Sequence, residues 1–310
     1  MSCSTDTSAQ LTPTQLGQLR WDLDPGRPLT VGVGSQPRGI AFDGTNIWVT
    51  NSESDNVTKI DPTTGDVIGT YAVGDYPFGI AFDGTNIWVS NRDSETLSRL
   101  NVSTGAVLST VSLSLNSDNY ALVWDGTHLW TNNNSYGIHR ITPGTEVVDS
   151  YGLPANSGTG FALAFDGSHI WVPSRNPASQ VVYRIDVANP ASAPVQVPVG
   201  SMPYGIAFDG EAIWVANEQS NTVTKITNIS APTPTTTTLA AGVEPRGVIF
   251  DGSCIWVSNY GASTLSRFDI RLNSRVDIPT GTSGVRTMVF DGSSIWLVSG
   301  DSASVRRLRN

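Results

Sequence analysis

Seven positions in this sequence carry residue types suited to recognising a negatively charged or aromatic ligand. Each of them lies five residues before an aspartate of a recurring motif. Arginine binds carboxylates and phosphates through paired hydrogen bonds, and aromatic rings offer stacking or a hydrophobic wall. We therefore predict a ligand-binding site formed by Arg38, Phe78, Tyr120, Phe161, Tyr204, Arg246 and Arg286. Its expected ligand is a small amphipathic molecule with an acidic end, a peptide C-terminus or an acidic sugar.

The recurring motif reads FDG-x-x-IW, and its spacing indicates how the chain is organised. Its aspartates are Asp43, Asp83, Asp125, Asp166, Asp209, Asp251 and Asp291, each followed five residues later by a tryptophan. Asp-Gly between apolar runs is a strong signal for a tight hairpin turn. Each unit then contains four short apolar runs separated by turn residues. Four strands in a unit of about 40 residues are typical of a propeller blade.

The repeat predicts an all-β fold, a seven-bladed β-propeller of four-stranded antiparallel blades. The seventh unit ends after its third strand, at residues 304–308, and therefore lacks a fourth strand. The segment at residues 28–34 resembles the fourth strands elsewhere, so we expect this N-terminal strand to complete the last blade and close the ring. Closure would remove exposed sheet edges. We assign residues 1–26 to a tail outside the repeat and residues 27–310 to a single propeller.

Ring closure makes the blades of Arg246, Arg286 and Arg38 neighbours, while the other four blades present aromatic residues in succession. Three arginines within a Debye length of about 8 Å repel one another unless something neutralises them. Two interpretations remain open. Acidic loop residues could neutralise the arginines, the candidates being Glu53, Asp93, Glu218, Glu244 and Asp301. Alternatively, the arginines form an anion site.

Other repeated positions indicate the scaffold. The third strand of each unit carries a basic residue for which the repeated Asp and Trp are natural partners: Lys59, Arg99, Arg140, Arg184, Lys225, Arg267 and Arg307. The second strands end in a polar ring that we interpret as structural: Asn51, Asn91, Asn133, Ser174, Asn217, Asn259 and Ser299. Four loop residues that differ between units could extend a site: Arg92, Arg175, Tyr136 and Tyr260.

Composition excludes several classes of partner. The formal net charge is −9, which disfavours nucleic acid because that affinity depends largely on neutralising phosphates. No run approaches the roughly 20 apolar residues of a membrane span, and the first residues lack the apolar core of a signal peptide. Cys3 and Cys254 form no metal motif, and we expect two unpaired thiols.

Segments of the form PxGIAFDGxxIWVTN, followed by SNTVTKIDPxTG, resemble the YVTN-repeat propellers and the virginiamycin B lyase-like (NHL-like) propellers. The resemblance extends over residues 28–310 and implies the fold. The lyase members cleave a cyclic depsipeptide antibiotic with a metal ion and with His and Glu residues. This sequence has three histidines, His128, His139 and His169, and none matches the catalytic pattern of those lyases. Nor does the sequence contain a GxSxG elbow, a P-loop or an HExxH motif.

We therefore predict no catalytic residues, no metal and no cofactor. The expected function is that of a non-catalytic binding or interaction propeller outside the cytoplasm, whose export signal is absent from this chain. The expected partner is a small anionic or amphipathic ligand, or a protein or peptide, at the mouth of the central channel. The alternatives are a metal-dependent enzyme of the virginiamycin B lyase type and a structural module of a surface assembly.

Overall fold

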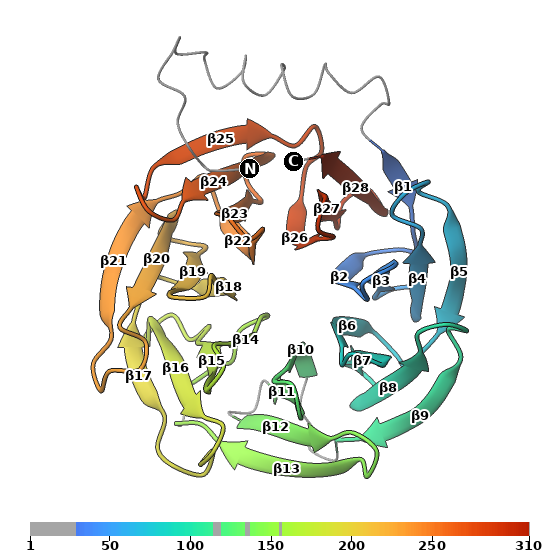
Figure 1. Cartoon of the computed structure of the whole chain (residues 1–310), viewed down its shortest axis with the longest axis horizontal. Helices are drawn as coiled ribbons and strands as arrows, with labels where there is room; N and C mark the ends of the chain where they lie inside the picture. The colour runs from blue at the N-terminus through green and yellow to red at the C-terminus, as the bar shows by residue number, and fades with distance from the viewer. Residues whose placement is uncertain (1–28, 114–118, 134–136, 155–156, 310) are drawn as a thin grey trace.

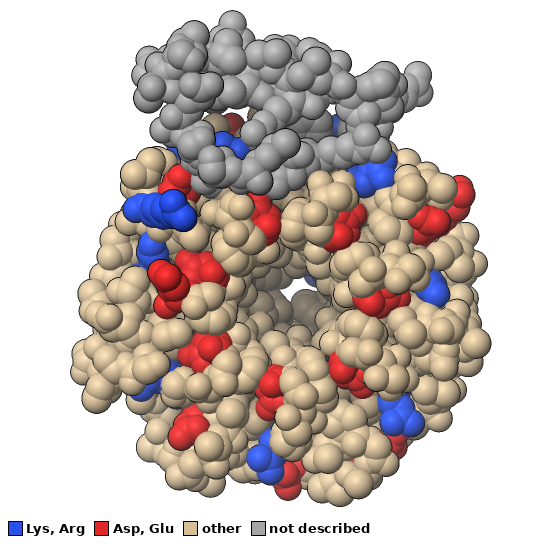
Figure 2. Space-filling model, viewed as in Figure 1, with Lys and Arg blue, Asp and Glu red and all other residues tan. Residues whose placement is uncertain are grey.

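The computed structural model describes residues 29–113, 119–133, 137–154 and 157–309, and these form a ring of sheets around a central channel (Figure 1). Within the described residues, 28 strands make seven four-stranded antiparallel sheets. The predicted seven-bladed propeller is thus confirmed. Figure 2 shows that the channel is open on the face viewed there, with acidic side chains around the opening. No helix in the described part of the chain is long and apolar enough to cross a membrane.

The blades follow one another along the chain. Blade 1 contains β2 (Pro37–Phe42), β3 (Ile47–Asn51), β4 (Asn56–Ile60) and β5 (Val67–Ala72). Blade 2 contains β6 (Pro77–Phe82), β7 (Asn86–Asn91), β8 (Thr96–Asn101) and β9 (Val107–Ser112). Blade 3 contains β10 (Asn119–Trp124), β11 (Leu129–Asn133), β12 (Gly137–Thr142) and β13 (Val147–Gly152). Blade 4 contains β14 (Ala164–Phe165), β15 (His169–Pro173), β16 (Val181–Asp186) and β17 (Val195–Pro198).

The remaining blades keep the same order. Blade 5 contains β18 (Pro203–Phe208), β19 (Ile213–Asn217), β20 (Thr222–Thr227) and β21 (Thr235–Ala240). Blade 6 contains β22 (Pro245–Phe250), β23 (Cys254–Asn259), β24 (Thr264–Asp269) and β25 (Arg275–Pro279). Blade 7 contains β26 (Val285–Phe290), β27 (Ser294–Ser299), β28 (Ser304–Arg309) and, as its outer strand, β1 (Thr30–Gly32).

The ring closes through β1, as predicted. β1 pairs antiparallel with β28, placing Val31 opposite Val305. Val31 is buried in a cluster with Trp296 of blade 7 and Ile47 of blade 1. The first described strand therefore ties the last blade to the first one. Because fully burying such a side chain contributes about 1.5–3 kcal/mol, this closure stabilises the whole ring.

Each Asp-Gly turn is built by the aspartate of the motif. In blade 1, Asp43 Oδ1 accepts hydrogen bonds from the backbone N–H groups of Thr45 and Asn46, at 2.7 and 2.6 Å. Trp48 Nε1 donates to Asp43 Oδ2 at 2.7 Å. The same Trp–Asp bond recurs in all seven blades, at 2.6 to 2.8 Å. The repeated carboxylate thus satisfies both the turn and a buried indole.

The repeated basic residues cover the tryptophans, and several of them also bind the following blade. In each blade the Lys or Arg of the third strand lies 4.9 to 6.0 Å from the centre of the Trp ring. Lys59 Nζ also donates to the carbonyl of Val102 in blade 2, at 2.7 Å. Arg307 of blade 7 donates to Thr63 O of blade 1, at 3.2 Å. The scaffold interpretation of these residues therefore agrees with their contacts.

Blade 4 departs from the pattern expected for the innermost strand. In blade 1 the hydroxyl of Thr50 accepts the N–H of Gly39, at 2.8 Å, beside the start of the strand. Pro173 occupies the equivalent position in blade 4 and has neither a hydroxyl nor an N–H group. The inner strand β14 of this blade is only two residues long, Ala164–Phe165. Phe161 therefore precedes the strand instead of belonging to it.

The expectation of two unpaired thiols is wrong for Cys254, which is disulfide-bonded. Cys254 is buried beside the motif turn of blade 6. The other cysteine of the sequence, Cys3, lies outside the described residues. Cys254 varies to Asn, Ala, His or Ser in the other units, which is why its position suggested no pairing.

Candidate functional site at the channel mouth

A backbone bulge aims the predicted residues at the channel. In blade 1 the pairing register between β2 and β3 shifts between Pro37 and Ile40, so Arg38 lies in the bulge. Similar shifts occur at the start of the inner strands of blades 2, 3, 5, 6 and 7. A bulge bends the strand and redirects a side chain. Every predicted site residue except Phe161 is therefore directed toward the channel by a bulge at the start of its inner strand.

The residue after the site position lets neighbouring blades approach closely. A Cβ atom added to Gly79 would lie 2.1 Å from Tyr120 O, and one added to Gly205 would lie 1.9 Å from Arg246 O. Hydroxyls of the second strands bond the carbonyls of two site residues: Thr50 Oγ1 donates to Phe78 O and Ser90 Oγ donates to Tyr120 O, both at 2.8 Å. The backbones of these site residues are thus packed against, or bonded to, the preceding blade.

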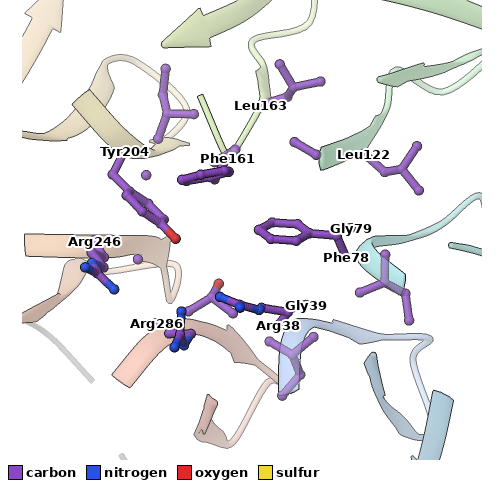
Figure 3. A pocket seen from close by; sticks show the side chains of 18 of the residues that line it. Arg38, Gly39, Phe78, Gly79, Leu122, Phe161, Leu163, Tyr204, Arg246 and Arg286 are labelled. Carbon is purple, nitrogen blue, oxygen red and sulfur yellow. The ribbon is translucent and has the colours of Figure 1, made fainter. Parts of the chain in front are cut away.

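All seven predicted residues line one cavity of about 260 Å³. We call it the mouth cavity; its other lining residues are Tyr76, Arg92, Arg175 and Glu218. Six of the seven, all except Tyr120, also line a second cavity of about 180 Å³ among the inner strands (Figure 3). Pockets for small molecules typically measure roughly 300–1,000 Å³. The mouth cavity therefore suits a small ligand or one end of a larger one.

The four aromatic residues form a packed wall. Phe161 is central to it, with its ring centre 4.8 Å from that of Tyr120, 4.9 Å from that of Tyr204 and 5.4 Å from that of Phe78. Phe78 and Tyr120 are themselves 5.2 Å apart in an edge-to-face arrangement, the geometry that aromatic pairs prefer. Phe78 and Tyr120 are buried. The rings of this wall that remain accessible from the cavity are therefore mainly those of Phe161 and Tyr204.

One carboxylate neutralises part of the arginine cluster. Glu218 follows β19 in blade 5, and its Oε1 lies 2.7 Å from Nη2 of Arg246 in blade 6. Its Oε2 lies 3.4 Å from Nη2 of Arg175 in blade 4. Of the five acidic loop residues considered from the sequence, only Glu218 pairs with a predicted site arginine in the described part of the chain. The neutralisation interpretation therefore holds for Arg246.

Arg38 and Arg286 have no carboxylate partner among the described residues. Arg38 Nη2 donates to the hydroxyl of Tyr76 at 2.8 Å, and its Nε lies 3.4 Å from Ser52 Oγ. Arg286 Nε is buried and has no hydrogen-bond partner in the part of the chain that the structure describes. The Arg286 guanidinium contacts the ring of Tyr260, at 5.6 Å from its centre. Two of the three arginines of the predicted arc thus contact only neutral groups.

The charge lining the mouth cavity is strongly positive. Its lining contains five arginines, Arg38, Arg92, Arg175, Arg246 and Arg286, and a single carboxylate, Glu218. Arg92 is paired outside this lining with Asp93, at 2.6 Å. Clefts lined by one sign of charge concentrate ions of the opposite sign. The mouth cavity has this character although the whole chain carries a net charge of −9.

Tyr204 supplies a neutral hydroxyl to this site. Figure 3 shows its oxygen pointing into the cavity. Burial raises the pKa of Tyr204, and although Arg246, Arg175 and Arg286 act in the opposite direction, the net shift is upward. The phenol therefore stays protonated near neutral pH and can donate a hydrogen bond.

The structure adds to the site one residue, Tyr76, that the sequence analysis missed. It also shows where the loop residues proposed to extend the site lie. Tyr76 stacks under Arg92, whose guanidinium lies 3.6 Å from the ring centre. The only sequence signal for Tyr76 was its place two residues before Phe78, where other units carry Gln36, Met202 or Glu244. The guanidinium carbon of Arg246 lies 3.5 Å from the ring centre of Tyr260. Tyr136 lies outside the described residues.

The polar ring is tied into the blades. Asn51 Nδ2 donates to Asn56 Oδ1 and Thr58 Oγ1, at 2.8 and 2.9 Å. The equivalent bonds recur for Asn91, Asn217 and Asn259. Loop backbone groups are also bonded, as expected: Gly242 N donates to Asn259 Oδ1 at 3.1 Å, and Ser299 Oγ donates to Ser283 O at 2.7 Å. These contacts agree with a structural role.

The histidines do not converge on one point. His128 and His169 each lie beside the motif aspartate of their own blade, with Nδ1 at 3.6 and 3.1 Å from a carboxylate oxygen. His139 is buried between Asn133 and Ser150. Among the described residues no group of three or more His, Cys, Asp or Glu could hold a metal ion. The donor set in the described part of the chain therefore does not fit the metal ion of a lyase.

The fold and site together define a seven-bladed propeller with a cationic channel mouth. Residues 78–205, less than half of the chain, match a family described as a repeat of unknown function, DUF6923. A search of curated proteins finds no match.

Among solved structures, virginiamycin B lyase from Staphylococcus aureus is similar, with a TM-score of 0.79, 18% identity, and coverage of 92% of this chain and 99% of that one. A catalytically inactive variant of that lyase, crystallised with quinupristin, gives a TM-score of 0.78 at 18% identity, with the same two coverages of 92% and 99%. Hydrazine synthase from Kuenenia stuttgartiensis gives 0.75 at 17% identity, covering 93% and 99%. The resemblance inferred from the sequence is thus confirmed as a likeness of fold.

Proposed function

We propose that this propeller is a non-catalytic binding module that takes a small anionic or amphipathic ligand, or the acidic end of a peptide, at the mouth cavity. The observation that carries the proposal is the composition of its lining, five arginines with one carboxylate. Unpaired charge away from water is costly. A negatively charged ligand would relieve that cost, and the aromatic wall would hold its apolar part.

The Cys254 disulfide supports placing this module outside the cytoplasm. Disulfides persist in oxidising compartments and are rare in reducing ones. Cys254 is disulfide-bonded in this chain. We therefore retain extracytoplasmic location as part of the proposal, and it is tested by measuring whether the bond forms in protein recovered from the native host.

A metal-dependent lyase is the second candidate, and the likeness of fold to virginiamycin B lyase is what favours it. The scattered histidines weigh against it. Incubation of the protein with a cyclic depsipeptide such as quinupristin, with and without divalent ions, would decide: ring opening seen by mass spectrometry and abolished by a chelator would replace the binding proposal.

The binding proposal is tested by thermal melts against a panel of carboxylates, phosphates, acidic peptides and acidic sugars. A ligand at 100 times its Kd stabilises the folded protein by about 2.7 kcal/mol. We expect anionic members of the panel to raise the Tm and their neutral analogues to leave it unchanged. The variant Arg38→Ala/Arg246→Ala/Arg286→Ala should lose the shift. If no anion raises the Tm, or if the triple variant responds like wild type, the proposal is wrong.

A further inference from the structure

The mouth cavity divides into an occupied half and an open half. Arg175 and Arg246 share the carboxylate of Glu218, at 3.4 and 2.7 Å. Arg38 and Arg286, from the neighbouring blades 1 and 7, have no carboxylate among the described residues. On the side of Arg175 and Arg246, the Glu218 carboxylate therefore already occupies the place that an anionic group of a ligand would take.

Arg286 is held in position without being satisfied. A Cβ atom added to Gly300 would lie 1.9 Å from Arg286 Nε, so the guanidinium packs directly on the glycine backbone. Its Nε is buried and unpartnered. A guanidinium that is fixed by packing loses little further freedom when it binds a ligand, and it keeps donors in a fork that matches a carboxylate. The same geometry gives no gain with a neutral ligand.

Arg38 and Arg286 lie on one side of the second cavity, opposite Phe161 (Figure 3), and both also line the mouth cavity. The Arg38 guanidinium is 5.7 Å from the ring centre of Phe78, which begins the aromatic wall. The Tyr204 hydroxyl also points into this space (Figure 3). A carboxylate at Arg38 and Arg286 would thus have donors on its own side, while an attached ring would meet Phe161 and Tyr204.

We infer that the ligand carries a single carboxylate, which binds Arg38 and Arg286, and that Glu218 makes the site selective for monoanions by occupying the second cationic position. This inference rests on the proposed binding function and specifies its ligand class. A dianion would place its second charge near the Glu218 carboxylate, where like charges repel. Removing the charge of Glu218 opens the second position.

Calorimetric titration of the full chain tests this with three matched probes: 3-phenylpropionate, its neutral amide and the dianion phenylsuccinate. We expect wild type to prefer 3-phenylpropionate over both others. Arg286→Gln should weaken its binding at least about 10-fold, since a hydrogen bond to a charged group is worth roughly 1.5–3 kcal/mol. Arg175→Gln should weaken it less than Arg286→Gln does. Glu218→Gln should reverse the preference toward phenylsuccinate.

Two further variants separate position from charge and folding. Gly300→Ala keeps all the arginines but displaces the Arg286 guanidinium, so we expect it to weaken 3-phenylpropionate binding about as much as Arg286→Gln does. Arg271→Gln changes the net charge equally at an exposed residue outside the cavity, and we expect unchanged binding. Melting curves confirm that each variant is folded.

The outcomes distinguish the two levels of proposal. If wild type binds none of the anionic probes and no anion of the wider panel, the binding function itself is wrong. If an anion binds but Arg175→Gln weakens it more than Arg286→Gln, or if Glu218→Gln leaves the ratio of the two anionic probes unchanged, only the assignment of the subsite is wrong.

Discussion

Glu218 Oε1 and Arg246 Nη2 lie 2.7 Å apart across the junction of blades 5 and 6. The side chains are only 12% and 16% exposed, so dissolved salt screens this ion pair weakly. Because Glu218 also reaches Arg175 of blade 4, one carboxylate connects three successive blades around the mouth cavity. It determines both the stability of the cavity wall and the charge that remains for a ligand.

Replacing Glu218 should therefore destabilise the protein in a way that anions repair. In Glu218→Ala, Arg246 and Arg175 lose the carboxylate that pairs with both of them, and we expect unfolding to become easier by roughly 1–3 kcal/mol. Added phosphate should restore more of the Tm in this variant than in wild type. Urea unfolding with and without phosphate measures both effects, and a variant as stable as wild type in phosphate-free buffer would contradict the expectation.

The motif aspartate should be important for stability in every blade. Asp43→Ala removes the acceptor of two backbone N–H groups and of the Trp48 indole. We expect a loss of roughly 2–4 kcal/mol, because buried donors are left unsatisfied. Asp75→Ala, at an exposed aspartate in the loop between blades 1 and 2, is the control and should change stability by less than about 0.5 kcal/mol. Equal melting temperatures for the two variants would refute this role.

Close approach of the blades makes Gly79 intolerant of a side chain. In Gly79→Ala the new Cβ atom would lie 2.1 Å from the carbonyl oxygen of Tyr120, and backbone must move. We expect a loss of roughly 1–3 kcal/mol, the usual range for overpacking. Gly32→Ala adds the same atom where nothing lies within 4 Å. Chemical denaturation should rank wild type and Gly32→Ala together, well above Gly79→Ala.

His139 should make stability depend on pH. Burial lowers the pKa of His139 from 6.5 to about 4. Between these values the unfolded chain binds a proton that the folded chain does not, so stability rises with pH there. The contribution is complete above about pH 6.5 and is lost as the pH falls toward 4, by roughly 3 kcal/mol at most.

The variant His139→Thr isolates this effect, because Thr58 and Thr224 accept the equivalent asparagine bond in blades 1 and 5. Urea unfolding of both proteins from pH 8 to pH 4.5 measures the difference. We expect the stability of wild type to fall more steeply below pH 6.5. Parallel curves for the two proteins would show that His139 does not titrate in this way.

The fold could be predicted from the sequence because it is repeated in it. Seven Asp–Trp pairs at near-constant spacing, with turn residues between apolar runs, leave a closed ring of blades as the way to bury every unit. The same spacing predicted which residues face the channel, because Arg38, Phe78 and Tyr204 occupy one register position in equivalent bulges. Closure by β1 followed from counting strands.

Contacts between side chains of different blades depend on loop geometry, which the repeat does not encode. The sequence contained five acidic candidates for the arginine arc, and only the folded loops decided that Glu218 takes Arg246 and leaves Arg286 open. The shortened strand Ala164–Phe165 and the disulfide at Cys254 likewise appeared only in three dimensions. Local patterns determine the blades because each blade is built from short-range hydrogen bonds. The charge left at the mouth was decided by tertiary structure, because it depends on ångström-scale distances between residues far apart in the chain.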